Sequence, residues 1–187
     1  MKHLIDSVKS IVLYPFFFKS FGKGSRLIRP LMIDGMKNIE IGERVYINSQ
    51  SWIACLPLTG RDNPILQFGR GTVIGNYNHI YATQSIVFEE GVLTADKVYV
   101  ADNQHAYEDV SQPVLRQSIK QLSPVRIGEG SWLGENVCVI GASVGKHCVI
   151  GANSVVTKDI PDYCVAVGAP ARIVKKYDFE KKEWIRV

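Results

Sequence analysis

One histidine stands where a long polar segment interrupts an otherwise regular hydrophobic pattern. His105 lies at the start of residues 104–125, which contain Pro113 and Pro124 and follow no repeat. A loop of this length inside a compact fold usually has a function. An imidazole has an ordinary pKa of about 6.5, so it can act as a general base near neutral pH. A surface histidine without a catalytic role is the alternative that spacing alone leaves open.

The other histidines lie in positions that favour structural roles. His79 and His147 fall within repeat units, where packing or capping is expected, and His3 belongs to the N-terminal segment. A catalytic base must be held in one tautomer, usually by a carboxylate or carbonyl at its second nitrogen. Three carboxylates near His105 are candidates for that partner: Asp102, Glu108 and Asp109.

A six-residue hydrophobic period predicts the scaffold. Apolar residues recur six apart in one run and then in a second: Phe68, Ile74, Ile80, Ile86, Val92 and Val98; Ile127, Leu133, Val139, Val144, Ile150 and Val156. The second run slips by one residue after Val139, where we expect a local bulge. This period fits neither an amphipathic helix nor a long alternating strand. It predicts an all-β fold, a triangular parallel β-helix whose apolar residues point inward.

Interruptions of the repeat divide the chain. We expect residues 1–32 to pack on the solenoid as an N-terminal segment, residues 33–160 to form the β-helix, and residues 161–187 to form a C-terminal extension. Residues 54–64 are predicted to form a loop, and residues 104–126 a longer excursion. The fifth positions of the middle repeats are polar, which suggests a face that lines a wet site.

The N-terminal segment has neither the length nor the pattern of a targeting signal. Residues 11–18 are apolar, but Pro15 interrupts them and the run is too short to span a bilayer. No small-residue cleavage pattern follows, so a secretory signal is not expected. Helical spacing predicts a short amphipathic helix, which with nearby lysines would make a weak contact with a membrane surface: Leu4, Ile5, Val8, Ile11 and Val12.

Composition narrows the class of protein. The 187 residues are 46% hydrophobic and 21% charged, which is ordinary for a globular domain. The net charge of +4 suits the binding of anionic small molecules. The sequence lacks the dense basic patch of a nucleic-acid-binding protein. The four cysteines form no CxxC pair, so we expect buried thiols in a reducing compartment.

The third repeat block resembles a known family. Residues 127–176 read IGEGSWLGENVCVIGASVGKHCVIGANSVVTKDIPDYCVAVGAPARIVKK and closely resemble the C-terminal half of hexapeptide-repeat O-acetyltransferases. That family includes galactoside and maltose acetyltransferases, and the DNQH segment at residues 102–105 is closer to acetyltransferases of O-antigen and capsule synthesis. The resemblance covers about residues 33–176. It implies a left-handed β-helix, a homotrimer with active sites between subunits, and acetyl-CoA as acyl donor, with no metal.

The resemblance also implies roles for individual residues. His105 takes the position of the catalytic histidine, and Asp102 is the preferred partner because relatives in polysaccharide synthesis place Asp shortly before it. The N–H of Glu135 would stabilise the oxyanion, although galactoside acetyltransferases have a small hydroxyl residue there. Asn78 would bind the acceptor. The cofactor-binding residues would be Trp132, Glu135, Gly151, Ala152, Thr157, Lys158, Arg172 and Lys175.

The expected function is an acetyl-CoA-dependent O-acetyltransferase acting on a sugar hydroxyl in O-antigen, capsule or other surface-polysaccharide synthesis. The expected location is cytoplasmic, at the inner membrane surface. Acetylation of a xenobiotic, an antibiotic or an amino sugar is the alternative among transferases. A γ-type carbonic anhydrase would need several converging histidine ligands, and a non-catalytic solenoid would need no cofactor.

Overall fold

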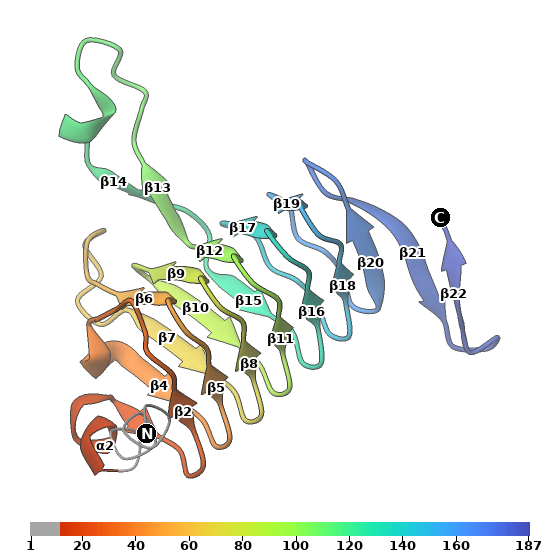
Figure 1. Cartoon of the computed structure of the whole chain (residues 1–187). Helices are drawn as coiled ribbons and strands as arrows, with labels where there is room; N and C mark the ends of the chain where they lie inside the picture. The colour runs from red at the N-terminus through yellow and green to blue at the C-terminus, as the bar shows by residue number, and fades with distance from the viewer. Residues whose placement is uncertain (1–11) are drawn as a thin grey trace.

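The computed structural model describes residues 12–187. Its short strands form three parallel sheets, and consecutive strands pass from one sheet to the next, so the chain winds into stacked coils (Figure 1). Sheet A contains β1 (Ser20–Phe21), β4 (Ile39–Ile41), β7 (Ile65–Phe68), β10 (Ser85–Phe88) and β15 (Val125–Ile127). Sheet B begins with β2 (Arg26–Leu27), β5 (Tyr46–Ile47), β8 (Val73–Ile74), β11 (Leu93–Thr94), β16 (Trp132–Leu133), β18 (Val149–Ile150) and β20 (Cys164–Val167). Sheet C contains β3 (Met32–Asp34), β6 (Trp52–Cys55), β9 (His79–Ala82), β12 (Tyr99–Ala101), β17 (Cys138–Ile140) and β19 (Val155–Val156).

The core is a set of inward columns that run along the stack. In sheet A, for example, Ile41, Phe68, Phe88 and Ile127 lie side by side and are fully buried. The rings of Phe68 and Phe88 stack with centroids 5.1 Å apart. Because each coil covers the apolar residues of the next, stability comes from stacking. The all-β class and the parallel sheets confirm that part of the expectation, and their stacking fits a β-helix.

Two corners of the coil are uniform. Six positions separate the inward residues of sheet A from those of sheet B, and of sheet B from those of sheet C, as in Phe68, Ile74 and Ile80. One residue with positive φ turns the chain at most of these corners. Between sheets B and C these residues are Arg29 (φ 42), Gln50 (φ 61), Tyr77 (φ 56), Lys97 (φ 59), Asn136 (φ 58) and Asn153 (φ 59).

The third corner, between sheets C and A, carries the interruptions, and we call it the variable corner. It holds the 3-10 turn η2 (Met36–Asn38), the loop of residues 56–64 and the long excursion, all on one edge of the solenoid (Figure 1). Near the C-terminus the same corner shortens, because Val139 and Val144 are only five positions apart. Gly141 (φ 55) makes that tight turn, so the expected bulge is instead a missing residue.

The variable corner also contains an insertion that the regular period conceals. Phe88, not Ile86, lies opposite Phe68, while Ile86 lies opposite Leu66. Eight positions therefore separate Ile80 from the equivalent residue Phe88, and two extra residues enter at residues 83–85. The six-residue spacing survives in the sequence only because alternate residues of each short strand point inward.

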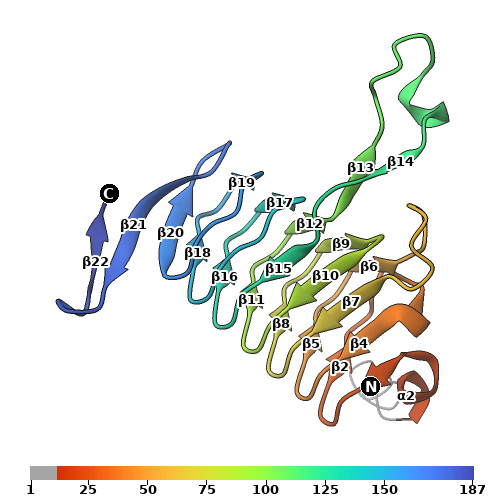
Figure 2. The ribbon, with the colours of Figure 1, turned by 180° about the vertical axis from the view of Figure 1, so that it is seen from behind.

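Parallel strand pairing extends beyond the boundaries predicted at residues 33 and 160. Strands β1 and β2 already pair in parallel with β4 and β5, and β20 continues the parallel ladder of β18 up to Val167. After it, β21 (Arg172–Asp178) and β22 (Glu183–Arg186) extend sheet B as an antiparallel hairpin (Figure 2).

The N-terminal end is closed by a short helix and aromatic packing. Helix α2 (Tyr14–Phe17) places Tyr14 against Phe18 and Phe21, with ring centroids 5.5 and 5.7 Å apart. Most of the predicted amphipathic helix lies outside the described residues, and Val12 is exposed. None of the helices within residues 12–187 is long and apolar enough to cross a membrane.

Candidate active site

The excursion at the variable corner is an antiparallel arm. Strand β13 (Asn103–His105) pairs with β14 (Ile119–Gln121), and His105 lies opposite Ile119. The 3-10 turn η3 (Val114–Arg116) lies toward the tip, which projects away from the coils (Figures 1 and 2). The paired strands of the arm run from Asn103 to Gln121, and β15 begins at Val125, so the excursion starts one residue before and ends before the expected range of residues 104–126. Pairing of the two strands fixes the backbone of His105.

Asp102 lies at the base of the arm, and its side chain is fully buried. Its carboxylate accepts hydrogen bonds from the backbone N–H groups of Thr83 (2.8 Å), Gln84 (2.7 Å) and Ser85 (2.7 Å). The Thr83 hydroxyl and the Asn103 amide donate to it as well, each at 3.1 Å. The two extra residues of this corner thus form a nest of N–H groups around a buried anion.

This arrangement corrects the expected role of Asp102. Five donors occupy its carboxylate, and no hydrogen bond joins it to His105 in the part of the chain that the structure describes. Its backbone carbonyl accepts from the Leu122 N–H (2.8 Å) and the Gln121 side-chain amide (2.6 Å). Asp102 therefore ties both strands of the arm to the coil rather than orienting the imidazole directly.

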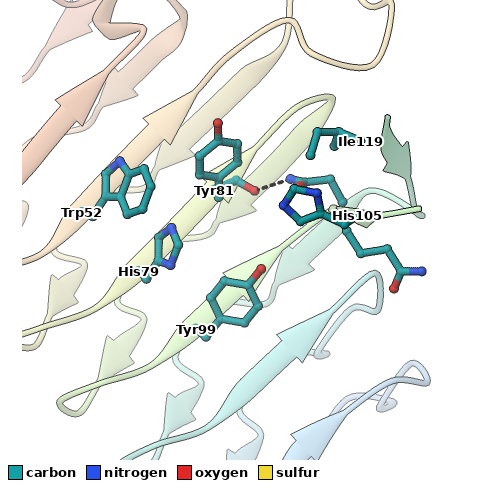
Figure 3. Close-up of a pocket in the computed structure, with 8 residues that line it drawn as sticks. Trp52, His79, Tyr81, Tyr99, His105 and Ile119 are labelled. Atoms are coloured by element: carbon teal, nitrogen blue, oxygen red, sulfur yellow. Dashed lines mark hydrogen bonds between the residues drawn. The ribbon is translucent and has the colours of Figure 1, made fainter. Parts of the chain in front are cut away.

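A cavity of about 590 Å³ opens between the arm and the outer face of sheet C (Figure 3). His105 is exposed and lies at one end of it, beside Ile119. Within residues 12–187, the His105 side chain makes no hydrogen bond, so both nitrogens are available to a ligand. Trp52, Tyr81 and Tyr99 form the aromatic wall.

His79 is the centre of this wall. Its ring stacks on Trp52 with centroids 4.3 Å apart and planes 7° apart, and Trp52 is fixed because its indole N–H donates to Asp34 (3.0 Å). Burial lowers the pKa of His79 below its ordinary value, and its buried Nε2 has no hydrogen-bond partner. Sequence reasoning assigned His79 to packing. The missed signal is that Trp52, His79 and Tyr99 each precede an inward residue of sheet C and lie opposite one another.

The structure also corrects the expectation for Asn78. This residue is buried inside the corner between sheets B and C. Its amide donates to the carbonyls of Asn76 (3.2 Å) and Ala95 (3.1 Å), and its oxygen accepts from the Thr94 hydroxyl (3.2 Å). All its polar groups are occupied by the solenoid, so Asn78 has none to offer an acceptor.

Four of the predicted cofactor residues lie on two corners and an outer face near the C-terminal end. Trp132 is 46% exposed on the outer face of β16. At the following corner the Glu135 carboxylate pairs with Lys97 (2.9 Å). The backbone N–H of Glu135 donates no hydrogen bond within residues 12–187. Ala152 is exposed, whereas a Cβ on Gly151 would lie 2.8 Å from the Val167 side chain. A larger side chain at Gly151 would therefore require Val167 to move.

Basic residues gather at a separate place. Lys158 and Arg172 line a cavity of about 370 Å³, with Thr157 exposed next to Lys158. Lys175 lies further along β21, outside this lining. None of the three cations forms an ion pair within the described chain. This cavity shares no residue with the cavity at His105.

Clusters of metal-ligating side chains and cysteine thiols are the other candidates for reactive groups among residues 12–187. No group of three or more His, Cys, Asp or Glu side chains is arranged to hold a metal ion anywhere in residues 12–187. The four cysteines are unpaired, and burial raises the pKa of Cys55 to about 12 and that of Cys148 to about 11. Buried neutral thiols are poor nucleophiles.

Known proteins resemble the chain in sequence and in fold. Residues 124–158 match the family model described as the hexapeptide repeat of succinyl-transferase. A putative lipopolysaccharide biosynthesis O-acetyl transferase of Escherichia coli is 34% identical over 188 residues, covering 96% of this chain and 91% of the relative. A probable acetyltransferase of Mycobacterium tuberculosis is 38% identical over 141 residues, which cover 75% of this chain but only 45% of the relative.

The fold of the chain also matches a solved enzyme. A variant of an N-acyltransferase from Bacillus cereus, in complex with dTDP and coenzyme A, superposes with a TM-score of 0.74. The alignment covers 90% of this chain and 89% of that one at 19% identity, a level that supports the fold alone. The repeat match and the nearly full-length similarity to the Escherichia coli protein lead to one assignment. The chain belongs to the hexapeptide-repeat acetyltransferase family.

Proposed function

We propose that this protein transfers an acetyl group from acetyl-CoA to a sugar hydroxyl, with His105 as the general base. The observation that carries this proposal is the exposed imidazole on a paired strand, at one end of a cavity large enough for a ligand. Its volume lies within the range of about 300–1,000 Å³ typical of small-molecule sites. The name of the Escherichia coli relative supports a role in surface-polysaccharide synthesis.

In the proposed mechanism, acetyl-CoA supplies a thioester carbonyl. A neutral His105 nitrogen accepts the proton of the sugar hydroxyl as its oxygen forms a bond to the carbonyl carbon. The backbone N–H of Glu135 donates a hydrogen bond to the oxyanion. Within residues 12–187 this N–H has no other acceptor. When the C–S bond breaks, the His105 imidazolium returns the proton to the thiolate, and the products are the acetylated sugar and coenzyme A.

Lys158 and Arg172 are suited to bind the phosphates of the donor. Arginine makes bidentate contacts with phosphate, whereas lysine acts as a point charge, and neither is neutralised by a carboxylate here. Their cavity is separate from that of His105 within one chain. We therefore propose a left-handed coil assembled as a homotrimer, in which the His105 cavity of one subunit faces the donor site of its neighbour. Cyclic symmetry permits such a shared site.

Acetyl transfer from radiolabelled acetyl-CoA to a panel of bacterial saccharides tests the function. The His105→Ala variant should lower kcat by about 10²- to 10⁴-fold, the usual contribution of a general base. The matched control is His147→Asn, because His147 (φ 48) lies at a corner outside the cavity and Asn tolerates that backbone. Near-normal turnover of His105→Ala would remove His105 from the mechanism.

A mixing experiment tests the shared site. His105→Ala subunits and Lys158→Ala/Arg172→Ala subunits, each nearly inactive, are denatured together and refolded. Restored activity, with a trimeric mass in sedimentation, is expected because some interfaces combine one intact half of each kind. Mixed trimers without activity would show that one subunit holds the whole site.

We also propose a cytoplasmic location with a weak membrane contact. Four unpaired cysteines support a reducing compartment. At the N-terminal end, Leu13, Phe16 and Phe17 are exposed, and such apolar side chains are suited to a membrane surface; Lys19 nearby pairs with Glu40 (2.9 Å). Sedimentation with anionic phosphatidylglycerol vesicles should pull down the wild-type protein more strongly than a Phe16→Ser/Phe17→Ser variant. Equal sedimentation of the two would contradict the contact.

A further inference from the structure

We propose that the aromatic wall of the His105 cavity is a second saccharide subsite, which binds the sugar next to the one that is acetylated. This inference rests on the proposed function and narrows the acceptor to glycans of at least two linked sugars. Its basis is the row formed by Trp52, His79 and Tyr99 on the neighbouring strands β6, β9 and β12 (Figure 3).

The wall has the chemistry of a sugar-binding surface. One face of a pyranose is largely C–H groups, which pack favourably on aromatic rings, while its hydroxyls point outward toward polar groups. The rings are held in place: the Trp52 indole by Asp34, and His79 by stacking on Trp52. Tyr81 meets both edge-on, at 5.7 and 5.9 Å between centroids. A rigid wall loses little entropy when a ring binds it.

The dimensions favour more than one sugar. Trp52 lies at one end of the cavity and His105 near the other (Figure 3). The row from β6 to β12 covers two interstrand steps, or about 10 Å. This length exceeds one pyranose ring, so a sugar whose hydroxyl reaches His105 leaves most of the row uncovered. A linked second ring fills the remaining space.

Unused polar groups in the wall have the positions expected of hydroxyl partners. His79 Nε2 is buried and has no hydrogen-bond partner within residues 12–187. The hydroxyls of Tyr81 and Tyr99 make no hydrogen bond within residues 12–187, and both side chains are half-buried. Such groups give orientation to an otherwise apolar site.

Saturation-transfer NMR and calorimetry test the subsite. The probes are methyl glycopyranosides of glucose, galactose, N-acetylglucosamine and rhamnose, and the 1→3- and 1→4-linked disaccharides of these sugars. At least one disaccharide should bind wild-type protein tenfold or more tightly than its component sugars. Trp52→Leu and Tyr99→Leu should each remove most of that gain without changing monosaccharide binding. Tyr46→Leu, at an exposed aromatic on sheet B outside the cavity, is the matched control.

The outcomes separate this inference from the proposed function. Disaccharides that bind no better than monosaccharides, or a gain that survives in both wall variants, would overturn the subsite; binding of no saccharide would do the same. Should Trp52→Leu fail to fold, Tyr81→Phe, which keeps the ring and deletes only a hydroxyl, should weaken disaccharide binding at least threefold. Disaccharide binding without acetyl transfer to any sugar would overturn the transferase proposal while supporting the subsite.

Discussion

Replacing Asp102 by Asn separates two roles for this carboxylate. In either orientation of the Asn side chain, an NH₂ group takes the place of an oxygen that accepts at least two N–H donors. On one side these are the N–H groups of Gln84 and Ser85, and on the other the Thr83 N–H and the Asn103 amide. A buried donor left unsatisfied costs about 1–3 kcal/mol, so two of them predict a loss of about 2–6 kcal/mol.

The loss should appear as instability at the base of the arm. For a domain of this size, 1 kcal/mol lowers the melting midpoint by about 2–4 °C, so Asp102→Asn should melt at least about 5 °C below wild type. Trypsin should cut the arm faster after Arg116 or Lys120, because the carbonyl and carboxylate of Asp102 hold its base to the coil. Asp109→Asn is the control, since Asp109 is exposed and bonds only within the arm.

Activity of the same variant decides between the roles. If Asp102 acts through the position of the arm, the turnover of the variant should fall together with its stability. Turnover should recover in part when the protein is cooled or when acceptor binds the arm. A variant that melts like wild type and resists trypsin, yet loses 10²-fold or more in kcat, would refute this reasoning. That result would restore direct orientation of His105 by Asp102.

Two further predictions concern buried titratable groups. Because burial lowers the pKa of His79, the folded state favours the neutral ring; the stability from this preference is complete above about pH 6.5 and is lost as the pH falls toward the folded pKa. The urea concentration at the unfolding midpoint should therefore fall more between pH 7.5 and 5.5 in wild type than in His79→Gln. An equal fall in the two proteins would contradict this prediction. Cys55 and Cys148 should alkylate at least tenfold more slowly in native than in unfolded protein at pH 8, because burial raises both thiol pKa values; equal peptide-resolved rates would contradict this.

The scaffold could be predicted because the same packing requirement recurs in every coil. Nearly every short strand of the coils points an apolar residue inward, with Thr94 of β11 as an exception, so the period occurs many times in the sequence. The arm was predictable for the opposite reason, since residues 104–125 abandon the period and still return to it. Register was not predictable: alternate residues point inward, so a two-residue insertion at residues 83–85 leaves the six-residue spacing intact.

The predictions for Asn78 and Asp102 were wrong for the same physical reason. Asn78 and Asp102 occupy the fifth position of their repeats, where polar residues suggested a face exposed to water. Both instead point into a corner and satisfy backbone groups of an adjacent coil, as the buried hydroxyl of Thr72 does with the Glu89 carbonyl. A solenoid has unpaired backbone groups at each corner, and short polar side chains satisfy them. Position within the repeat therefore does not by itself predict burial, because Glu90 is also at a fifth position and is exposed; the register decides which of these side chains point inward.

The variable corner links these observations to function. Strands on either side of the other two corners are fixed by six-residue spacing, so any change of length there would shift every coil above it out of register. Length changes at the variable corner leave the coils stacked, and it is there that the loop of residues 56–64, the Asp102 nest and the arm accumulate. These insertions contact one another, since Gln121 of the arm accepts from the Thr83 hydroxyl (3.0 Å) and from Thr59. The variable corner can thus change in length while the strands of sheet C and the other two corners keep their register.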